Sequence, residues 1–91
     1  MKKFRIRGAL GGGFGGCENK EWKEIKAKDI DDAFSQAWLL ACEEYDSYAG
    51  LHGLRDVEQI IEEDGASEDE TQEIYIEERE SWIDYEAEEI E

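Results

Sequence analysis

The stretch that decides the fold runs from Asp29 to Gly50 and reads DIDDAFSQAWLLACEEYDSYAG. Its apolar side chains recur at steps of three and four residues, which is the period of an α-helix with one broad apolar face. Asp29 suits the N-cap, where a carboxylate accepts a hydrogen bond from a free amide of the first turn. Gly50 can adopt the left-handed conformation that ends a helix. The residues of this face are Ile30, Phe34, Ala37, Trp38, Ala41, Tyr45 and Tyr48. We therefore expect a long helix that covers a small sheet.

Two strands are expected before this helix. Residues 3–10 alternate between apolar or small side chains and charged ones, which is typical of a half-buried strand. Residues 21–28 form the second strand, although Trp22 does not fit its alternation and indicates a bulge or an exposed indole. The glycine-rich segment 11–16 then becomes a long hairpin loop with Phe14 at its tip.

A short second helix is expected across residues 54–64. Leu54, Val57, Glu58 and Ile61 lie at helical spacing, with the regular helix beginning at residue 56, and Gly65 follows as a stop signal. A strand is the competing interpretation, because Val57, Ile60 and Ile61 also suit one. The polar residues 65–70 are expected to form a loop.

The C-terminal part alternates again in residues 71–78 and 82–90, which predicts a hairpin with its turn at residues 79–81. A capped helix that begins at Ser67 is the alternative for the first of these segments. The resulting fold class is α+β, a single domain over residues 1–91 with the order β-β-α-α-β-β. We expect a four-stranded antiparallel sheet with one long and one short helix on one face.

Charge dominates the composition. Ten basic and 26 acidic residues give a net charge of -16, and 40% hydrophobic residues supply enough apolar mass to argue against disorder. The charge is uneven: residues 1–28 hold eight Lys or Arg and three Glu, whereas residues 29–91 hold two Arg and 23 acids. The two parts therefore carry +5 and -21, which indicates a basic partner for the acidic part. No run of apolar residues is long enough to span a membrane, and two cysteines without a disulfide framework favour a reducing cytoplasm.

The acidic stretch from Glu62 to Glu91 carries the candidate site. If residues 82–90 form a strand, their alternate acids project from one face at intervals of about 6.6–6.8 Å. That interval is similar to the spacing of phosphates along one nucleic-acid strand. The neighbouring strand adds a second row of acids, with two aromatic side chains between the rows. The first row is Asp84, Glu86 and Glu88, the second is Glu73, Glu77 and Glu78, and the aromatic residues are Tyr75 and Trp82.

From this pattern we predict that a basic groove built for a phosphate backbone binds the acidic surface. The competing interpretation is a solvated surface that keeps the protein soluble. However, a net charge of -16 also costs folding stability through self-repulsion, which solubility alone does not require. The predicted partner-binding residues are Glu62, Glu63, Asp64, Glu68, Asp69, Glu70, Glu73, Tyr75, Glu77, Glu78, Glu80, Trp82, Asp84, Glu86 and Glu88.

The other motifs do not indicate catalysis, a cofactor or a metal. Residues 11–16 match the glycine pattern of a dinucleotide site, but a strand rather than a helix is expected after them. His52, Cys17 and Cys42 lack the spacing of zinc ligands. The calcium-like start at Asp29 lacks the glycine and the closing glutamate of such a loop. We therefore expect a protein that is not an enzyme.

In size, acidity, α+β pattern and the Glu-rich stretch 56–91, the chain resembles phage and mobile-element proteins that block host defence, the anti-CRISPR and anti-restriction proteins of the DNA-mimic type. The resemblance implies an inhibitor that occupies the DNA- or guide-binding channel of a host nuclease in the host cytoplasm, without binding nucleic acid or membrane itself. The basic first hairpin departs from the simplest mimic. The alternative function is an acidic adaptor whose aromatic residues Phe14, Trp22 and Tyr75 contact another protein.

Overall fold

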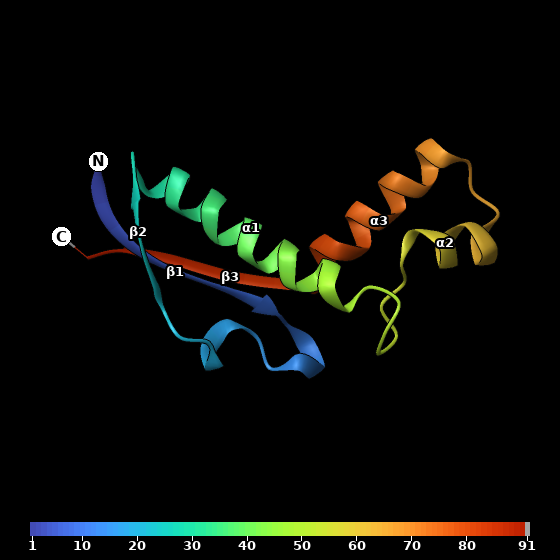
Figure 1. The fold of residues 1–91 in the computed structure, drawn as a ribbon, viewed down its shortest axis with the longest axis horizontal. Helices are drawn as coiled ribbons and strands as arrows, with labels where there is room; N and C mark the ends of the chain where they lie inside the picture. Colours follow the sequence, from blue (N-terminus) through green and yellow to red (C-terminus); the bar gives the residue numbers. More distant parts are fainter. Residues whose placement is uncertain (91) are drawn as a thin grey trace.

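The computed structural model describes residues 1–90 and shows an α+β fold built on a three-stranded antiparallel sheet (Figure 1). Along the chain the elements are β1 (Lys2–Leu10), η1 (Gly12–Phe14), η2 (Cys17–Asn19), β2 (Lys23–Ala27), α1 (Ile30–Tyr48), α2 (Val57–Asp64), α3 (Glu68–Trp82) and β3 (Ile83–Glu89). The two η elements are single 3₁₀ turns. β1 is the central strand, and the sheet order is β2-β1-β3. No helix in this part of the chain has the length and apolar character needed to cross a membrane.

The long helix is confirmed as α1, and Asp29 is its N-cap, with a side chain that accepts the backbone N–H of Asp32 at 2.9 Å. Its buried face is narrower than predicted. The alanines and Tyr45 are fully buried, whereas Ile30 and Phe34 lie on the flank and remain 41% and 39% exposed. Small residues therefore form the contact with the sheet, which brings the helix close to the strands.

That close approach centres on Gly8 of β1. A Cβ atom at this position would lie 2.7 Å from both the carbonyl oxygen of Ala37 and the amide nitrogen of Ala41. Only glycine fits there, because both neighbours are backbone atoms that cannot rotate away. The contact lies between two core clusters: one joins α1 to β1 and β2, and the other lies at the end of β1 around Tyr45, Leu10 and Leu54.

The predicted C-terminal hairpin is wrong. Residues 71–78 belong to α3, so the turn at residues 79–81 does not exist, and β3 pairs antiparallel with β1 instead. The alternative, a capped helix from Ser67, is confirmed: the Ser67 hydroxyl accepts the Glu70 N–H at 3.3 Å. Three acids in the first turn complement the helix dipole, and Glu, Gln and Arg are good helix formers. The sheet accordingly has three strands and not four.

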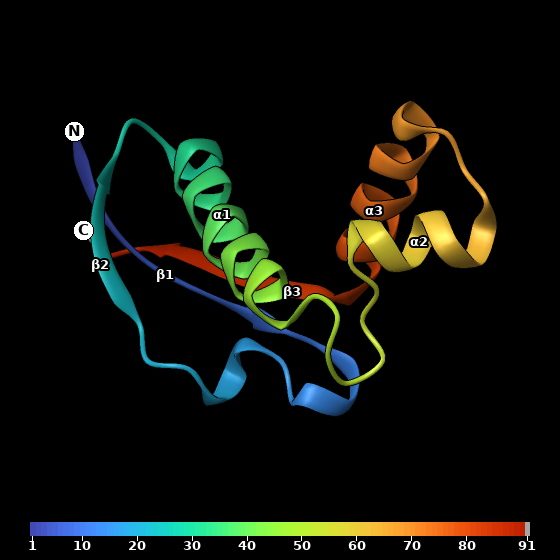
Figure 2. The ribbon, with the colours of Figure 1, turned by 45° about the vertical axis from the view of Figure 1, so that its right-hand side comes forward.

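The short second helix is confirmed as α2. Asp56 caps it in a reciprocal capping box with Gln59, and Gly65 ends it with a φ of 63°. The expected loop 65–70 is shorter than predicted, because α3 begins at Glu68. The placement of the helices also differs from the prediction. α1 alone covers the sheet, while α2 and α3 form a pair beyond its end (Figures 1 and 2).

The close contact at Gly8 yields a stability prediction. Gly8→Ala should lower the free energy of unfolding by about 1–3 kcal/mol, the usual effect of overpacking a core. Denaturant unfolding followed by circular dichroism measures it. Gly13→Ala is the matched control, because a Cβ there meets nothing within 4 Å. Equal stability of the two variants would show that α1 does not rest on β1 as described.

Candidate functional site

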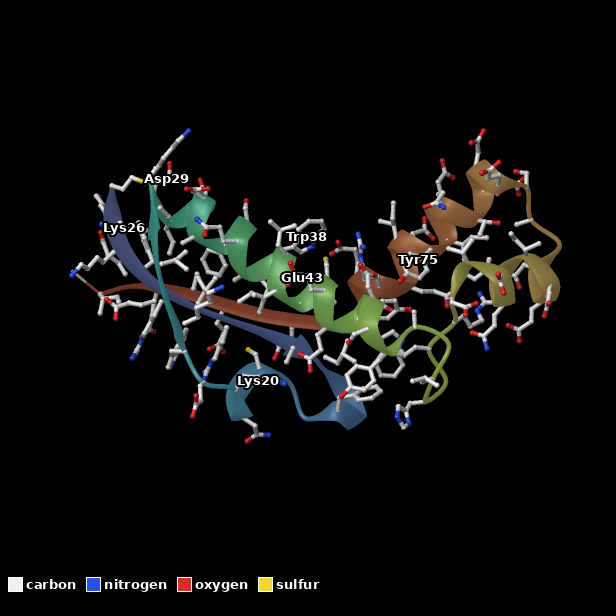
Figure 3. The ribbon with its side chains drawn as sticks, viewed as in Figure 1. Lys20, Lys26, Asp29, Trp38, Glu43 and Tyr75 are labelled. Atoms are coloured by element: carbon white, nitrogen blue, oxygen red, sulfur yellow. The ribbon has the colours of Figure 1, made fainter. Side chains whose placement is uncertain are left out.

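The predicted partner-binding residues lie on two separate surfaces instead of one pair of facing rows. Ten of the acids are on α2 and α3, and three are on β3. The α2–α3 group consists of Glu62, Glu63, Asp64, Glu68, Asp69, Glu70, Glu73, Glu77, Glu78 and Glu80, and the β3 group consists of Asp84, Glu86 and Glu88. Figure 3 shows carboxylate oxygens concentrated around α2 and α3. The predicted two-row geometry is therefore wrong, because its second strand is a helix.

The carboxylates of β3 lie on the face of the sheet away from α1, here called the open face, and they have partners within the chain. Arg7 donates to Glu86 at 2.9 Å, and Arg5 forms an ion pair with Glu88. The environment of Trp22 explains why it departs from the strand pattern. Its ring stacks on the guanidinium groups of both arginines, with the ring centroid 4.1 Å from Cζ of Arg7 and 4.5 Å from Cζ of Arg5. The basic first hairpin thus neutralises much of the β3 row, and this row is not a run of free charges.

Asp84 has a different role. Its carboxylate accepts the backbone N–H of Cys17 at 2.9 Å, which fixes the η2 turn against the open face. Cys17 is fully buried there, and burial raises the pKa of its thiol to about 11, with the neighbouring Asp84 acting in the same direction. Cys17 and Cys42 are both free thiols.

A row of uncompensated charges lies along one face of α3. Glu70, Glu73, Glu77 and Glu80 follow one another at steps of three and four residues, so they share one side of the helix, here called the α3 stripe. All four are exposed, and none forms an ion pair with another residue in 1–90. Their only side-chain hydrogen bonds come from neutral donors: Ser67 to Glu70 and the Trp38 indole to Glu80. Each like-charged neighbour pair costs the helix about 0.2–0.5 kcal/mol.

A single arginine holds the two acidic helices together. Arg55 lies just before α2 and donates to Asp64 at 3.0 and 3.2 Å, at the far end of the same helix. It also donates to Glu78 of α3 at 3.1 Å and approaches Glu63 at 3.5 Å. The hydrogen bonds that Arg55 donates, first to Glu78 and then to Asp64, raise the pKa of its guanidinium group. Three of the predicted site acids are therefore structural ligands of one guanidinium group.

The α3 helix docks on the last turns of α1 through Tyr75 and Arg79. The Tyr75 hydroxyl donates to Asp46 at 2.6 Å, and its ring packs edge-on against Tyr45 at 5.6 Å. Arg79 lies over the rings of Trp38 and Tyr75, at 5.5 and 5.9 Å. Burial and the bond to Asp46 raise the pKa of Tyr75. Tyr75, predicted to lie between rows of carboxylates, points instead toward α1 (Figure 3).

Trp82 lies where α3 passes into β3, and it packs against the glycine-rich segment. The Phe14 ring contacts Trp82 at 5.7 Å between centroids, and Tyr48 and His52 lie at 6.1 and 6.3 Å. Phe14 is therefore an anchor within the chain and not a free loop tip. Sequence reasoning missed this cluster and the role of Arg55; the available signal for the latter was that residues 29–91 hold only two arginines against 23 acids.

No protein-family model, curated protein or solved structure matches the chain. Within residues 1–90, no three His, Cys, Asp or Glu side chains are grouped so that they could hold a metal ion. The geometry of the side chains is thus the basis for any functional proposal.

The Arg55 contacts predict that Arg55→Gln loosens the α2–α3 pair. Three carboxylates would then lie close together without a cation, so amides of both helices should exchange faster with solvent, while those of α1 and the sheet stay protected. Hydrogen exchange by mass spectrometry measures the change. Lys23→Gln, which removes an exposed charge that forms no ion pair within residues 1–90, should leave the pattern unchanged. Unaltered exchange in Arg55→Gln would refute the role of this arginine.

The buried thiol predicts low reactivity. In a Cys42→Ala variant at pH 8, the pKa shift from 9.0 to about 11 reduces the thiolate fraction of Cys17 about hundredfold. A thiol reagent should therefore label Cys17 far more slowly in the native protein than in denaturant. Because the unfolded thiol ionises first, this residue also makes the fold less stable as pH rises from 9.0 toward 11. Equal labelling rates in both states would contradict its burial.

Proposed function

We propose that the protein is a non-enzymatic inhibitor that binds the basic nucleic-acid channel of a nucleic-acid-binding protein, such as a host defence nuclease, in the cytoplasm of the host cell. The observation that carries the proposal is the α3 stripe: four exposed carboxylates at fixed spacing without a cation of their own. In the surrounding segment, residues 57–82, eleven acids stand against one arginine.

The spacing of the stripe suits a groove that receives a phosphate backbone. At about 1.5 Å per residue, steps of three and four residues place its carboxylates about 4.5–6 Å apart along the helix axis. One strand of duplex DNA carries a phosphate about every 3.4 Å along its axis, so the stripe has a somewhat lower line charge. Glu58 and Glu62 are exposed on neighbouring α2 and add to the same acidic end.

The fixed position of α3 supports the same proposal. The Arg55 contacts, the helix caps and the docking of Tyr75 on α1 hold α3 in place before any partner binds. Fewer side chains and backbone segments then lose freedom on association, which favours affinity. A lysine- or arginine-lined channel would also relieve the repulsion among the carboxylates, which the chain itself does not relieve.

The test compares charge-reversal variants of equal net charge. One variant carries Glu70→Lys, Glu73→Lys and Glu77→Lys, and the control carries Glu18→Lys, Glu21→Lys and Glu43→Lys, three exposed acids outside α2 and α3. Both are immobilised and used to capture proteins from a host lysate at about 50 mM and about 200 mM salt, a range over which phosphate-like contacts weaken steeply. Circular dichroism checks that both variants fold.

We expect the wild type and the control to capture a basic nucleic-acid-binding protein that added duplex DNA or RNA releases, and the stripe variant to lose it. Capture that survives reversal of the stripe, or that nucleic acid does not compete with, would refute mimicry. It would favour the second candidate, an adaptor that binds through aromatic side chains, of which Phe14 keeps a partly exposed ring.

A further inference from the structure

The outer edge of β3 is an unpaired strand edge. The amide of Ile90 donates to the Lys3 carbonyl, and the amide of Gly11 donates to the Trp82 carbonyl. With the antiparallel register between them, the even-numbered residues of β3 direct their backbone groups toward β1. The odd-numbered residues therefore point theirs outward. The Ile83 amide is used as the cap of α3, which leaves the amides of Tyr85, Ala87 and Glu89 facing solvent.

The other edge of the sheet, on β2, is partly occupied by side chains of α1. Gln36 donates to the Lys26 carbonyl at 3.3 Å, and Asp32 accepts the Lys28 amide at 3.0 Å. No side chain in residues 1–90 makes such a bond to the outward groups of β3. The outward backbone groups of β3 thus have no side-chain partner in residues 1–90, whereas part of the β2 edge is occupied. Figure 2 shows β3 at the edge of the sheet behind α1.

The two sides of this edge differ in chemistry. On the α1 side, the ring centroids of Phe34 and Tyr85 are 6.4 Å apart, and Ile30 lies one helical turn before Phe34. The side chains of Phe34 and Ile30 are both partly exposed. On the open face, Glu86 and Glu88 remain 42% and 47% exposed although Arg7 and Arg5 bind them. A carboxylate has room for about four hydrogen bonds, so both can accept another donor.

A second copy of this chain does not suit the edge. Pairing β3 with β3 in antiparallel fashion would set its acids opposite those of the partner, and like charges directly opposite are destabilising. A strand that alternates basic and apolar residues suits both sides at once. Its apolar residues would cover Phe34 and Ile30, and its lysines or arginines would meet Glu86 and Glu88.

We propose that the outer edge of β3 accepts an extended segment of a partner protein, with alternating basic and apolar residues, as a fourth antiparallel strand. This mode of recognition combines main-chain hydrogen bonds with pockets for alternate side chains. Antiparallel addition continues the pattern of the sheet. In that direction the apolar residues of the segment donate their amides to β3, and the amides of its basic residues face away.

The surface is separate from the α3 stripe, so the two proposals can fail independently. Binding at the edge depends on Glu86 and Glu88 of β3, whereas the proposed mimicry depends on Glu70, Glu73 and Glu77 of α3. A peptide that binds only through charge would engage either surface in any sequence order.

The experiment uses the full chain and four synthetic peptides. In the parent peptide lysine alternates with valine. One derivative is N-methylated on its valines, and the other is N-methylated on its lysines. N-methylation removes a backbone donor without changing a side chain. A further peptide of the same composition carries its lysines and valines in two blocks. Affinities are measured by fluorescence anisotropy at moderate salt.

We expect the parent and the lysine-methylated peptide to bind, and the valine-methylated and block peptides to bind about tenfold more weakly or not at all. On the protein, Glu88→Gln should weaken binding, and Glu77→Gln on α3 should not. Hydrogen exchange supplies an independent readout: the parent peptide should slow exchange of the Tyr85 and Ala87 amides, which are free in the isolated chain.

Equal binding of the two methylated peptides, or no change in exchange at Tyr85 and Ala87, would overturn strand addition. Loss of binding in the lysine-methylated peptide alone would overturn the antiparallel direction. If Glu77→Gln weakens peptide binding to the same degree as Glu88→Gln, the affinity depends only on the net charge of the protein.

Discussion

The contact between α1 and β1 is the constraint on which the rest of the structure depends. Because Gly8 has no side chain, Ala37 and Ala41 rest directly on the strand, and the helix lies along the sheet instead of being held away from it. The last turns of α1 then bring Tyr45 into the core cluster at the end of β1. Tyr75 of α3 docks on that tyrosine, so a backbone contact in the middle of the sheet sets the position of the acidic helices.

The cations of this chain determine which acids stay free. Arg5 and Arg7 bind acids of β3, and Arg55 binds three acids of the α2–α3 pair. Arg79 lies against aromatic rings near Asp46. The ten basic residues cannot cover 26 acids, and the face of α3 that turns away from the core receives none of them. On α3 four unpaired carboxylates are thus held next to one another on one rigid element.

Much of the fold could be predicted from local patterns, and the failures have physical causes. The 3.6-residue period and the Asp29 cap identified α1, and the helical spacing of residues 54–61 with the stop at Gly65 identified α2. The strand prediction for residues 71–78 failed because Ile74 and Ile76 alternate as in a strand. In the structure, α3 buries only Thr71 fully and has a weak apolar face. The pairing of β3 with β1 joins segments more than seventy residues apart, and nothing local to either segment specifies it.

The candidate site was predictable as a composition but not as a geometry. An acidic run can be recognised from the sequence, yet whether each carboxylate is free depends on which cation the fold brings beside it. Glu86 and Glu77 look alike in the sequence, but one meets Arg7 across a strand pair and the other faces solvent from a helix. Because an acid already bound to an arginine offers less to a partner than an unpaired one, the location of the unpaired acids indicates where a basic partner gains most affinity. By that argument the unpaired carboxylates of α3 favour long-range electrostatic attraction. The edge of β3, whose acids are partly neutralised and whose outward amides are free to form hydrogen bonds, favours a short-range contact of defined geometry.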